Sequence, residues 1–185
     1  ITGAATDPDG GRWHWARVIR PGVAPGTLEV GTQVSVDQPR EVFHLPVMML
    51  TLGTREAGPR KRQAILAGVE YLEDEPSSSE ADLEGPQSRR QVVDTARLTF
   101  PMAAVVSGGG YVGFDWEMQP DLAVVFDSPD RLFGTGRHVA GLVFPGSDGL
   151  NRPEGGLVPY AGMRVAAGAR LEARARLLAG KGASV

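Results

Sequence analysis

Hydrophobic and polar residues alternate along several segments of the chain. In residues 28–36, LEVGTQVSV, apolar side chains and Thr32 occupy every second position, and polar residues or Gly31 lie between them. In residues 169–178, ARLEARARLL, leucine and alanine alternate with arginine and glutamate. A period of two places the apolar residues on one face of a strand, whereas on a helix they would spread around the axis. We therefore expect half-buried antiparallel strands at both places, although Ala, Leu, Arg and Glu are strong helix formers.

Other segments are almost entirely apolar, which is typical of strands that are covered on both faces. Residues 42–52 and 96–106 are of this kind. Because a proline removes one hydrogen bond from a ladder, we expect a bulge or a sheet edge at Pro46. The run SGGG at 107–110 predicts a tight turn, so that 96–106 and 110–117 form a hairpin. The central sheet is expected to comprise residues 28–36, 42–52, 96–106, 110–117 and 122–127.

Weaker patterns add short strands elsewhere in the chain. We expect strands at 13–20 and 139–144, and a further short strand within 157–165. Residues 63–72 combine helix-favouring alanines with glycine and valine, and we interpret them as strand. The polar segment 73–90, EDEPSSSEADLEGPQSRR, is expected to be a long surface loop.

The composition is that of one globular domain with many turns. The chain has 185 residues and a hydrophobic content of 42%, which is enough for a core. Its 25 glycines and 14 prolines favour many short strands over long helices. We predict an all-β, mainly antiparallel β-sandwich that forms a single domain over residues 13–185. Residues 1–12, ITGAATDPDGGR, are interpreted as a flexible leader or linker. Because the chain begins with Ile1, we expect either a processed mature chain or a domain cut from a longer protein, and we favour the second.

Charge and motifs exclude several classes of function. The net charge of −3 argues against nucleic acid or an anionic membrane as partner, and no apolar run approaches the roughly 20 residues that span a bilayer. The absence of cysteine excludes disulfides and thiolate metal sites, and His14, His44 and His138 lack the spacing of metal ligands. There is no nucleophile-elbow motif and no dinucleotide-binding motif. We therefore expect neither a metal nor a cofactor.

Aromatic residues and carboxylates are densest in residues 111–133, YVGFDWEMQPDLAVVFDSPDRLF. On a strand, Tyr111, Asp115 and Glu117 share one face, and Trp116 lies on the opposite, apolar face. Two carboxylates near an aromatic side chain resemble the acid and base of a glycosidase, but they are also typical of a solvated strand end. The candidate catalytic residues are Asp115, Glu117 and Asp130, and the candidate ligand-binding residues are Tyr111, Asp115 and Glu117.

Three neighbouring features have structural and functional interpretations. Asp127 and Asp130 lie in a DSPD turn that could hold calcium, and we favour a purely structural turn. Trp13 and Trp15 would share a strand face, where they either stack on sugar rings or cover the edge of the core, which we favour. The acidic loop at 73–84 is a candidate wall for a site at Tyr111, Asp115 and Glu117.

The order of segments across about 17–180 resembles the β-supersandwich domains of bacterial polysaccharide-processing enzymes, which have a galactose-mutarotase-like fold. The resemblance rests on the long paired strands, on YVGFDW at 111–116, on FDSPDR at 126–131 and on the closing strand AGARL at 167–171. In such enzymes the sandwich often lies beside a helical catalytic toroid and carries few catalytic residues. No position here matches a catalytic residue of that family.

The resemblance implies a non-catalytic β-sandwich module of a larger carbohydrate-active protein, acting as a scaffold or as a weak glycan-binding domain. Its partner would be a polysaccharide or a neighbouring catalytic domain, which is compatible with a secreted or extracellular protein. One alternative is a glycoside hydrolase or sugar epimerase that uses Asp115, Glu117 or Asp130. A second alternative is a protein-interaction or structural domain.

Overall fold

The computed structural model describes residues 1–52, 63–67, 70–73, 91–93, 98–127, 137–145 and 162–182. Over these residues the chain forms strands and no helix, so that no helix there is available to cross a membrane. The strands are β1 (Thr2–Thr6), β2 (Arg12–Pro21), β3 (Thr27–Val36), β4 (Arg40–Val42), β5 (Leu45–Leu52), β6 (Gln63–Leu66), β7 (Glu70–Glu73), β8 (Gln91–Val93), β9 (Met102–Ser107), β10 (Gly110–Trp116), β11 (Ala123–Asp127), β12 (His138–Phe144), β13 (Met163–Val165) and β14 (Arg170–Lys181).

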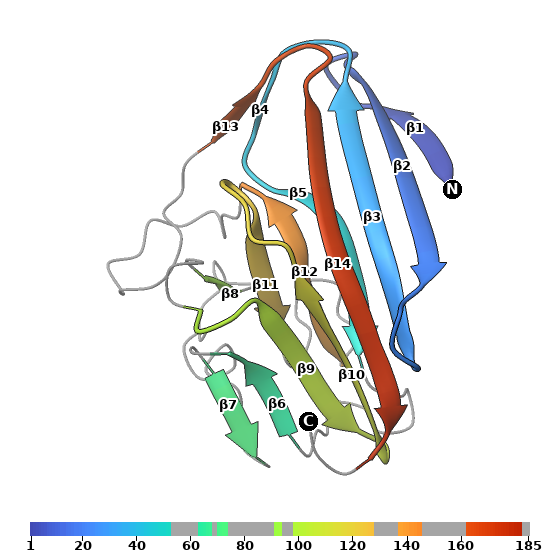
Figure 1. Cartoon of the computed structure of the whole chain (residues 1–185). Coiled ribbons are helices and arrows are strands. Elements are labelled where there is room, and N and C mark those ends of the chain that lie inside the picture. Colours follow the sequence, from blue (N-terminus) through green and yellow to red (C-terminus); the bar gives the residue numbers. More distant parts are fainter. Residues whose placement is uncertain are drawn as a thin grey trace.

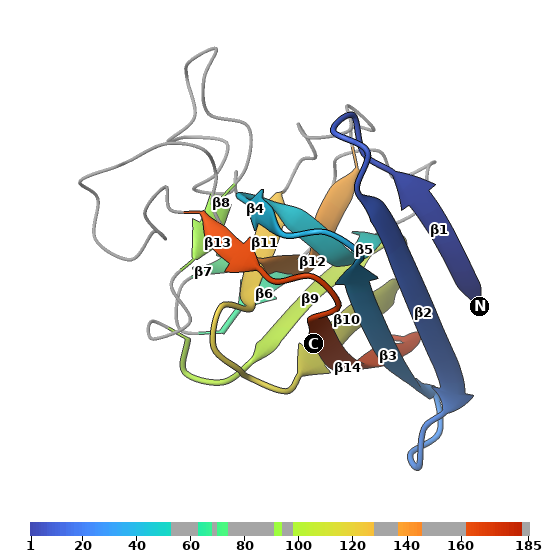
Figure 2. The same cartoon turned by 90° about the horizontal axis from the view of Figure 1, so that it is seen from above.

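The described strands form two antiparallel sheets and a small ribbon. The larger sheet has eight strands in the order β1-β2-β3-β14-β10-β9-β6-β7, and the smaller has four in the order β5-β12-β11-β8. Strands β13 and β4 form a separate two-stranded ribbon. Figures 1 and 2 show the two sheets as separate layers, with β1 and β2 at one end of the larger sheet. The predicted all-β, antiparallel sandwich is confirmed.

Buried side chains from both sheets meet in one hydrophobic cluster. Phe114 of β10 in the larger sheet and Phe126 of β11 in the smaller sheet are both fully buried in it. Leu52 of β5 and Leu142 of β12 belong to the same cluster. Full burial of such a side chain contributes roughly 1.5–3 kcal/mol, so this layer of side chains holds the two sheets together.

The expected central sheet is wrong in one respect. Residues 45–52 and 123–127 belong to the four-stranded sheet, whereas β3, β9, β10 and β14 lie in the eight-stranded sheet. Each predicted segment contains a strand, although β9 begins only at Met102 and not at residue 96. A period of two does not state which strands pair with one another. Strand β14 lies between β3 and β10, so the last long strand of the chain occupies the middle of the larger sheet (Figure 1).

The period of two predicted for the two half-buried strands is confirmed. In β3, Val30, Thr32, Val34 and Val36 are buried, and the residues between them are more exposed. In β14, Ala173 and Ala175 are buried, and the charged residues next to them are exposed. Leu171 and Leu177, on the same face of β14, are partly buried and pack against the core. Leu28 departs from the pattern because it is 43% exposed at the start of β3.

The predicted hairpin at 107–110 and the predicted irregularity at Pro46 are also confirmed. Strands β9 and β10 form a hairpin in which Ser107 pairs with Gly110. Gly108 and Gly109 connect them with φ values of 63° and 79°, which glycine adopts without steric cost and which suit a two-residue hairpin turn. At Pro46 the register of β5 against β12 shifts, and β5 is an edge strand of its sheet.

Residues 1–12 differ from the expected flexible leader. Thr2–Thr6 form β1, which pairs along its length with β2, and the turn that follows is held by Asp7. The sequence does not predict this strand, because its small and polar residues show no alternation of apolar and polar positions. Trp13 packs against the core, as expected for a residue at its edge. Trp15 is 37% exposed and its ring lies over Gly3.

The sequence predicts one strand over residues 63–72, whereas the structure has two, β6 and β7, which pair with each other in antiparallel orientation. Residues 42–52 likewise divide into the end of β4 and the whole of β5. Most of the predicted loop at 73–90 lies outside the described residues.

Candidate functional site

The outward face of the larger sheet carries charged residues on four neighbouring strands. Arg20 of β2 pairs in register with Glu29 of β3, and Glu29 pairs with Arg176 of β14. Arg176 in turn pairs with Asp115 of β10. Neighbouring positions across the four strands therefore carry charges of alternating sign. This arrangement follows from the period of two, which turns the apolar residues of these strands toward the core.

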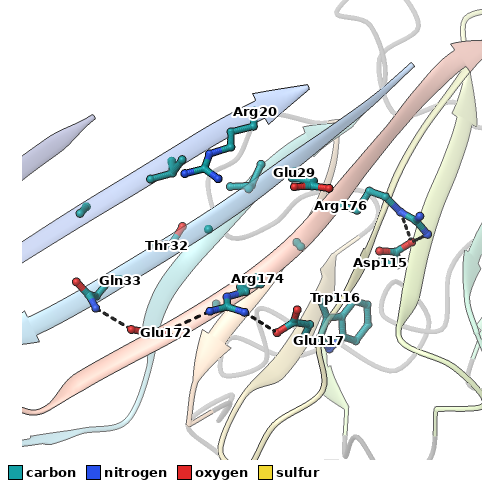
Figure 3. A pocket seen from close by; sticks show the side chains of 16 residues that line it. Arg20, Glu29, Thr32, Gln33, Asp115, Trp116, Glu117, Glu172, Arg174 and Arg176 are labelled. Carbon is teal, nitrogen blue, oxygen red and sulfur yellow. Dashed lines mark hydrogen bonds and ion pairs between the residues drawn. The ribbon is translucent and has the colours of Figure 1, made fainter. Parts of the chain in front are cut away.

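These side chains surround a hollow of about 790 Å³ on the surface of the sheet (Figure 3). It is lined by Ala16, Val18, Arg20, Glu29, Val30, Gly31, Thr32, Gln33, Asp115, Trp116, Glu117, Glu172, Ala173, Arg174, Ala175 and Arg176. The volume lies within the range of about 300–1,000 Å³ that is common for ligand sites. The hollow is therefore the candidate binding site.

Asp115 is held by Arg176 across β10 and β14. Its Oδ2 atom accepts hydrogen bonds from Nε of Arg176 at 3.0 Å and from Nη2 at 2.5 Å. The hydrogen bond and the charge of Asp115 raise the pKa of Arg176, and the charge of Glu29 contributes in the same direction. Asp115 is therefore an anchored carboxylate with a fixed position at the rim of the hollow.

Glu117 lies near a second arginine, at the end of β10. Its Oε2 atom is 3.7 Å from Nη1 of Arg174, and both side chains are about two-thirds exposed. Arg174 is also 4.0 Å from Glu172, whose Oε1 accepts a hydrogen bond of 2.7 Å from Nε2 of Gln33. Figure 3 shows these four side chains as a connected row from β3 across β14 to the segment after β10. Exposed ion pairs of this kind contribute little to stability, about 0–1 kcal/mol.

The predicted site residues fall into three groups. Asp115 and Glu117 line the same hollow. Tyr111 does not line it, since it lies four residues before Asp115, about 13 Å away along the strand. Tyr111 instead pairs with Gly180 of β14, and its ring lies against that glycine. Asp130 lies outside the described residues.

Two features that the sequence places near the site lie largely outside the described residues. The DSPD turn, beyond the backbone of Asp127, and nearly all of the acidic loop at 73–84 lie outside the described residues. In the part of the chain that the structure does describe, no group of three or more His, Asp or Glu side chains could hold a metal ion. Trp116 is 4% exposed and contacts Phe114, so it is a core residue, as the alternation along the strand predicted.

Sequence reasoning missed the side of the hollow formed by β2 and β3. Arg20, Glu29 and Gly31 line it, and they come from a part of the chain some 90 residues before Asp115. Their positions on the polar face of β3, or opposite it on β2, were readable from the alternation. The alternation does not predict that β3 pairs with β14 and that β14 pairs with β10. These two pairings bring the β2 and β3 residues beside Asp115.

Comparison with known proteins assigns no family to this chain. No family model matches it, and no curated protein matches it. Among solved structures, it is similar to the crystal structure of a "Putative aldose 1-epimerase" from Escherichia coli K12, with 17% sequence identity and a TM-score of 0.25. The match covers 97% of this chain and 68% of that chain. A likeness this weak carries no argument about function.

Proposed function

We propose that the chain is a non-catalytic β-sandwich module of a larger carbohydrate-active protein and that it binds glycan weakly. The observation that carries the proposal is the hollow on the outward face of the larger sheet. Its rim combines carboxylates, guanidinium groups and an amide from several strands. The binding surface thus belongs to a rigid sheet and needs no loop to form it.

The chemistry of this rim suits a ligand that is rich in hydroxyl groups. A sugar hydroxyl both donates and accepts hydrogen bonds, and a carboxylate such as Asp115 accepts while Arg174 and Gln33 donate. Asp115, Glu172 and Gln33 are already held by neighbours at hydrogen-bond distance, so their positions are fixed before a ligand arrives. Preorganisation of this kind reduces the entropic cost of binding.

Binding is better supported than hydrolysis by the same residues. A glycosidase needs one carboxylic acid that delivers a proton to the leaving oxygen and a second carboxylate across the scissile bond. Asp115 instead accepts two N–H groups from Arg176, and Glu117 faces Arg174. Both carboxylates also lie close together in sequence, Asp115 within β10 and Glu117 just after its end, on one side of the hollow. The enzyme alternative predicts that the isolated chain turns over a polysaccharide or epimerises a sugar.

Isothermal titration with soluble polysaccharides tests the proposal. The wild type is compared with the Asp115→Ala, Glu117→Ala double variant and with Tyr111→Ala, which serves as a control on the same strand and outside the hollow. We expect the wild type and Tyr111→Ala to bind alike, and the double variant to bind at least about tenfold more weakly while retaining its circular dichroism spectrum.

Two outcomes would contradict the proposal. The first is an absence of binding by the wild type to every polysaccharide of the panel, which would leave the module without a glycan. The second is turnover of a polysaccharide by the wild type that the double variant loses, which would favour the enzyme alternative.

A further inference from the structure

The floor of the hollow is open because a glycine stands at its centre. Gly31 pairs in register with Val18 on one side and with Arg174 on the other. A methyl group at Gly31 would meet no atom within 4 Å beyond its chain neighbours. The φ of Gly31 also lies outside the left-handed region, so the backbone does not require glycine here. The missing side chain therefore creates space between β2 and β14.

The floor is apolar, although the rim is charged. Ala16 and Val18 of β2 flank Gly31, and all three line the hollow. Val18 is 49% exposed on the outward face of the larger sheet. Most of the other outward-facing side chains that line the hollow are polar or charged. A small apolar floor with hydrogen-bonding groups around it matches a sugar ring, which has C–H groups on its faces and hydroxyls at its edge.

Two charged residues at one edge of this floor have no hydrogen bond or ion pair within the described residues. They are Arg20 of β2 and Glu29 of β3, which are neighbours in the register and are exposed. Figure 3 shows both beside the hollow without a dashed line to either. The charged residues at the opposite edge, from Asp115 to Glu172, are paired among themselves. A donor and an acceptor therefore remain available on the Arg20 side.

The charged side chains around the hollow carry one more negative than positive charge. Three arginines and four carboxylates line it, namely Arg20, Arg174, Arg176, Glu29, Asp115, Glu117 and Glu172. An anionic ligand would meet no excess of positive charge, and it would lie close to carboxylates that repel it. A neutral ligand has no such cost, because its hydroxyls can use Arg20 as a donor and Glu29 as an acceptor.

From these observations we infer that the hollow holds one ring of a neutral saccharide, with a C–H face of the ring on Gly31 and Val18 and its hydroxyls on Arg20 and Glu29. The inference rests on the proposed function and names its ligand class and the binding position. Neither Arg20, Glu29 nor Gly31 belongs to the residues that the sequence alone suggested.

Filling the hollow tests the position of the ligand. Gly31→Val and Gly31→Leu place a side chain on the floor, and Ser35→Val is the matched control, since Ser35 lies on the same face of β3 but does not line this hollow. Because valine suits a strand better than glycine does, we expect both Gly31 variants to keep or raise the melting temperature. We expect them to bind neutral polysaccharide at least about tenfold more weakly than the wild type and the Ser35→Val control.

The ligand class is tested by titrating two groups of probes, neutral polysaccharides (dextran, galactomannan, arabinoxylan) and uronate polysaccharides (alginate, polygalacturonate). We expect a neutral probe to bind at least about tenfold more tightly than any uronate. Glu29→Gln and Arg20→Gln should each weaken the neutral complex by roughly three- to tenfold. Tighter binding of a uronate, with a further gain in Glu29→Gln, would overturn the ligand class.

The experiments separate this inference from the proposed function. If the wild type binds no probe, the proposed function fails and the inference fails with it. If the wild type binds a neutral probe and a folded Gly31→Val variant binds it equally well, only the inference fails. Loss of binding in the Asp115→Ala, Glu117→Ala variant with no effect of Gly31→Leu would likewise place the ligand elsewhere on the rim.

Discussion

Arg40 grips both carboxylate oxygens of Asp7, with Nε 2.7 Å from Oδ2 and Nη2 3.0 Å from Oδ1. Asp7 also accepts hydrogen bonds from Nε1 of Trp13 at 2.9 Å and from the backbone N–H of Gly11 at 2.8 Å. Side chains of the Asp7–Arg40 pair are less than 20% exposed. This carboxylate therefore ties the β1–β2 hairpin to β4, which explains why residues 1–12 are not a free leader.

The same contacts predict a dependence of stability on acid. The hydrogen bond from Arg40 has the largest effect, and with those from Trp13 and Gly11 it holds the pKa of Asp7 far below its ordinary value of 3.8. A carboxyl whose pKa is lowered by folding stabilises the fold above its unfolded pKa and loses that contribution as the pH falls toward its folded pKa. We expect no loss from Asp7 between pH 7 and 5, and an increasing loss below about pH 4.

Urea unfolding of the wild type and of Asp7→Asn at pH 7, 4 and 2.5 measures this contribution. Asparagine cannot ionise, so the variant should have a lower midpoint than the wild type at pH 7. The difference between the two midpoints should shrink toward pH 2.5, because the wild type loses the stabilisation from ionised Asp7 there. The other carboxyls titrate equally in both proteins and therefore do not contribute to the difference. A constant difference across the pH range would refute the role given to the Asp7–Arg40 pair.

Substitutions at two adjacent positions of β14 should lower the free energy of unfolding by very different amounts. Ala173 is 3% exposed and faces the core, whereas Glu172 is exposed on the outward face. Ala173→Asp buries an unpaired charge and should lower the free energy of unfolding by several kcal/mol. Glu172→Ala should lower it by about 0.5 kcal/mol or less, as an exposed substitution. Similar costs at the two positions, measured by urea unfolding, would be inconsistent with the two faces of the strand.

Much of the fold could be predicted because local patterns carry it. The alternation in 169–178 indicated a strand although the residue types favour a helix, and β14 confirms that tertiary burial decides between them. The glycines at 107–110 predicted a hairpin, because a two-residue turn of this kind needs positive φ values. Pro46 predicted a bulge or an edge, and β5 has both.

The pairing of distant strands could not be predicted in this way. Arg176 lies beside Asp115 only because β14 is inserted between β3 and β10. The residue patterns of β10 and β14 do not indicate that these two strands pair. The sequence likewise groups Tyr111 with Asp115, because the two residues share a strand face. Tyr111 nevertheless does not line the hollow. Candidate residues chosen by their density along the chain therefore captured one edge of the hollow and missed the edge formed by Arg20 and Glu29.

Trp116 is more buried than Trp13, yet we expect its replacement by phenylalanine to destabilise the protein less. Trp116 is 4% exposed, and its buried Nε1 has no hydrogen-bond partner among the described residues. Trp13 is only partly buried, but its Nε1 donates to Asp7. Replacing Trp116 with phenylalanine loses some packing and also removes an unsatisfied buried donor, which costs roughly 1–3 kcal/mol in the wild type.

Because the two effects oppose each other, Trp116→Phe should change the free energy of unfolding by only about 1 kcal/mol in either direction. In Trp13→Phe both effects are unfavourable, since packing is lost and Asp7 loses a donor. We therefore expect Trp13→Phe to destabilise the protein more than Trp116→Phe, as measured by urea unfolding at pH 7. Phe114→Ala, a fully buried neighbour of Trp116, should cost about 3–5 kcal/mol and sets the scale for lost core packing. A larger loss in Trp116→Phe than in Trp13→Phe would mean that the indole N–H of Trp116 has a partner, such as a buried water, that stabilises it.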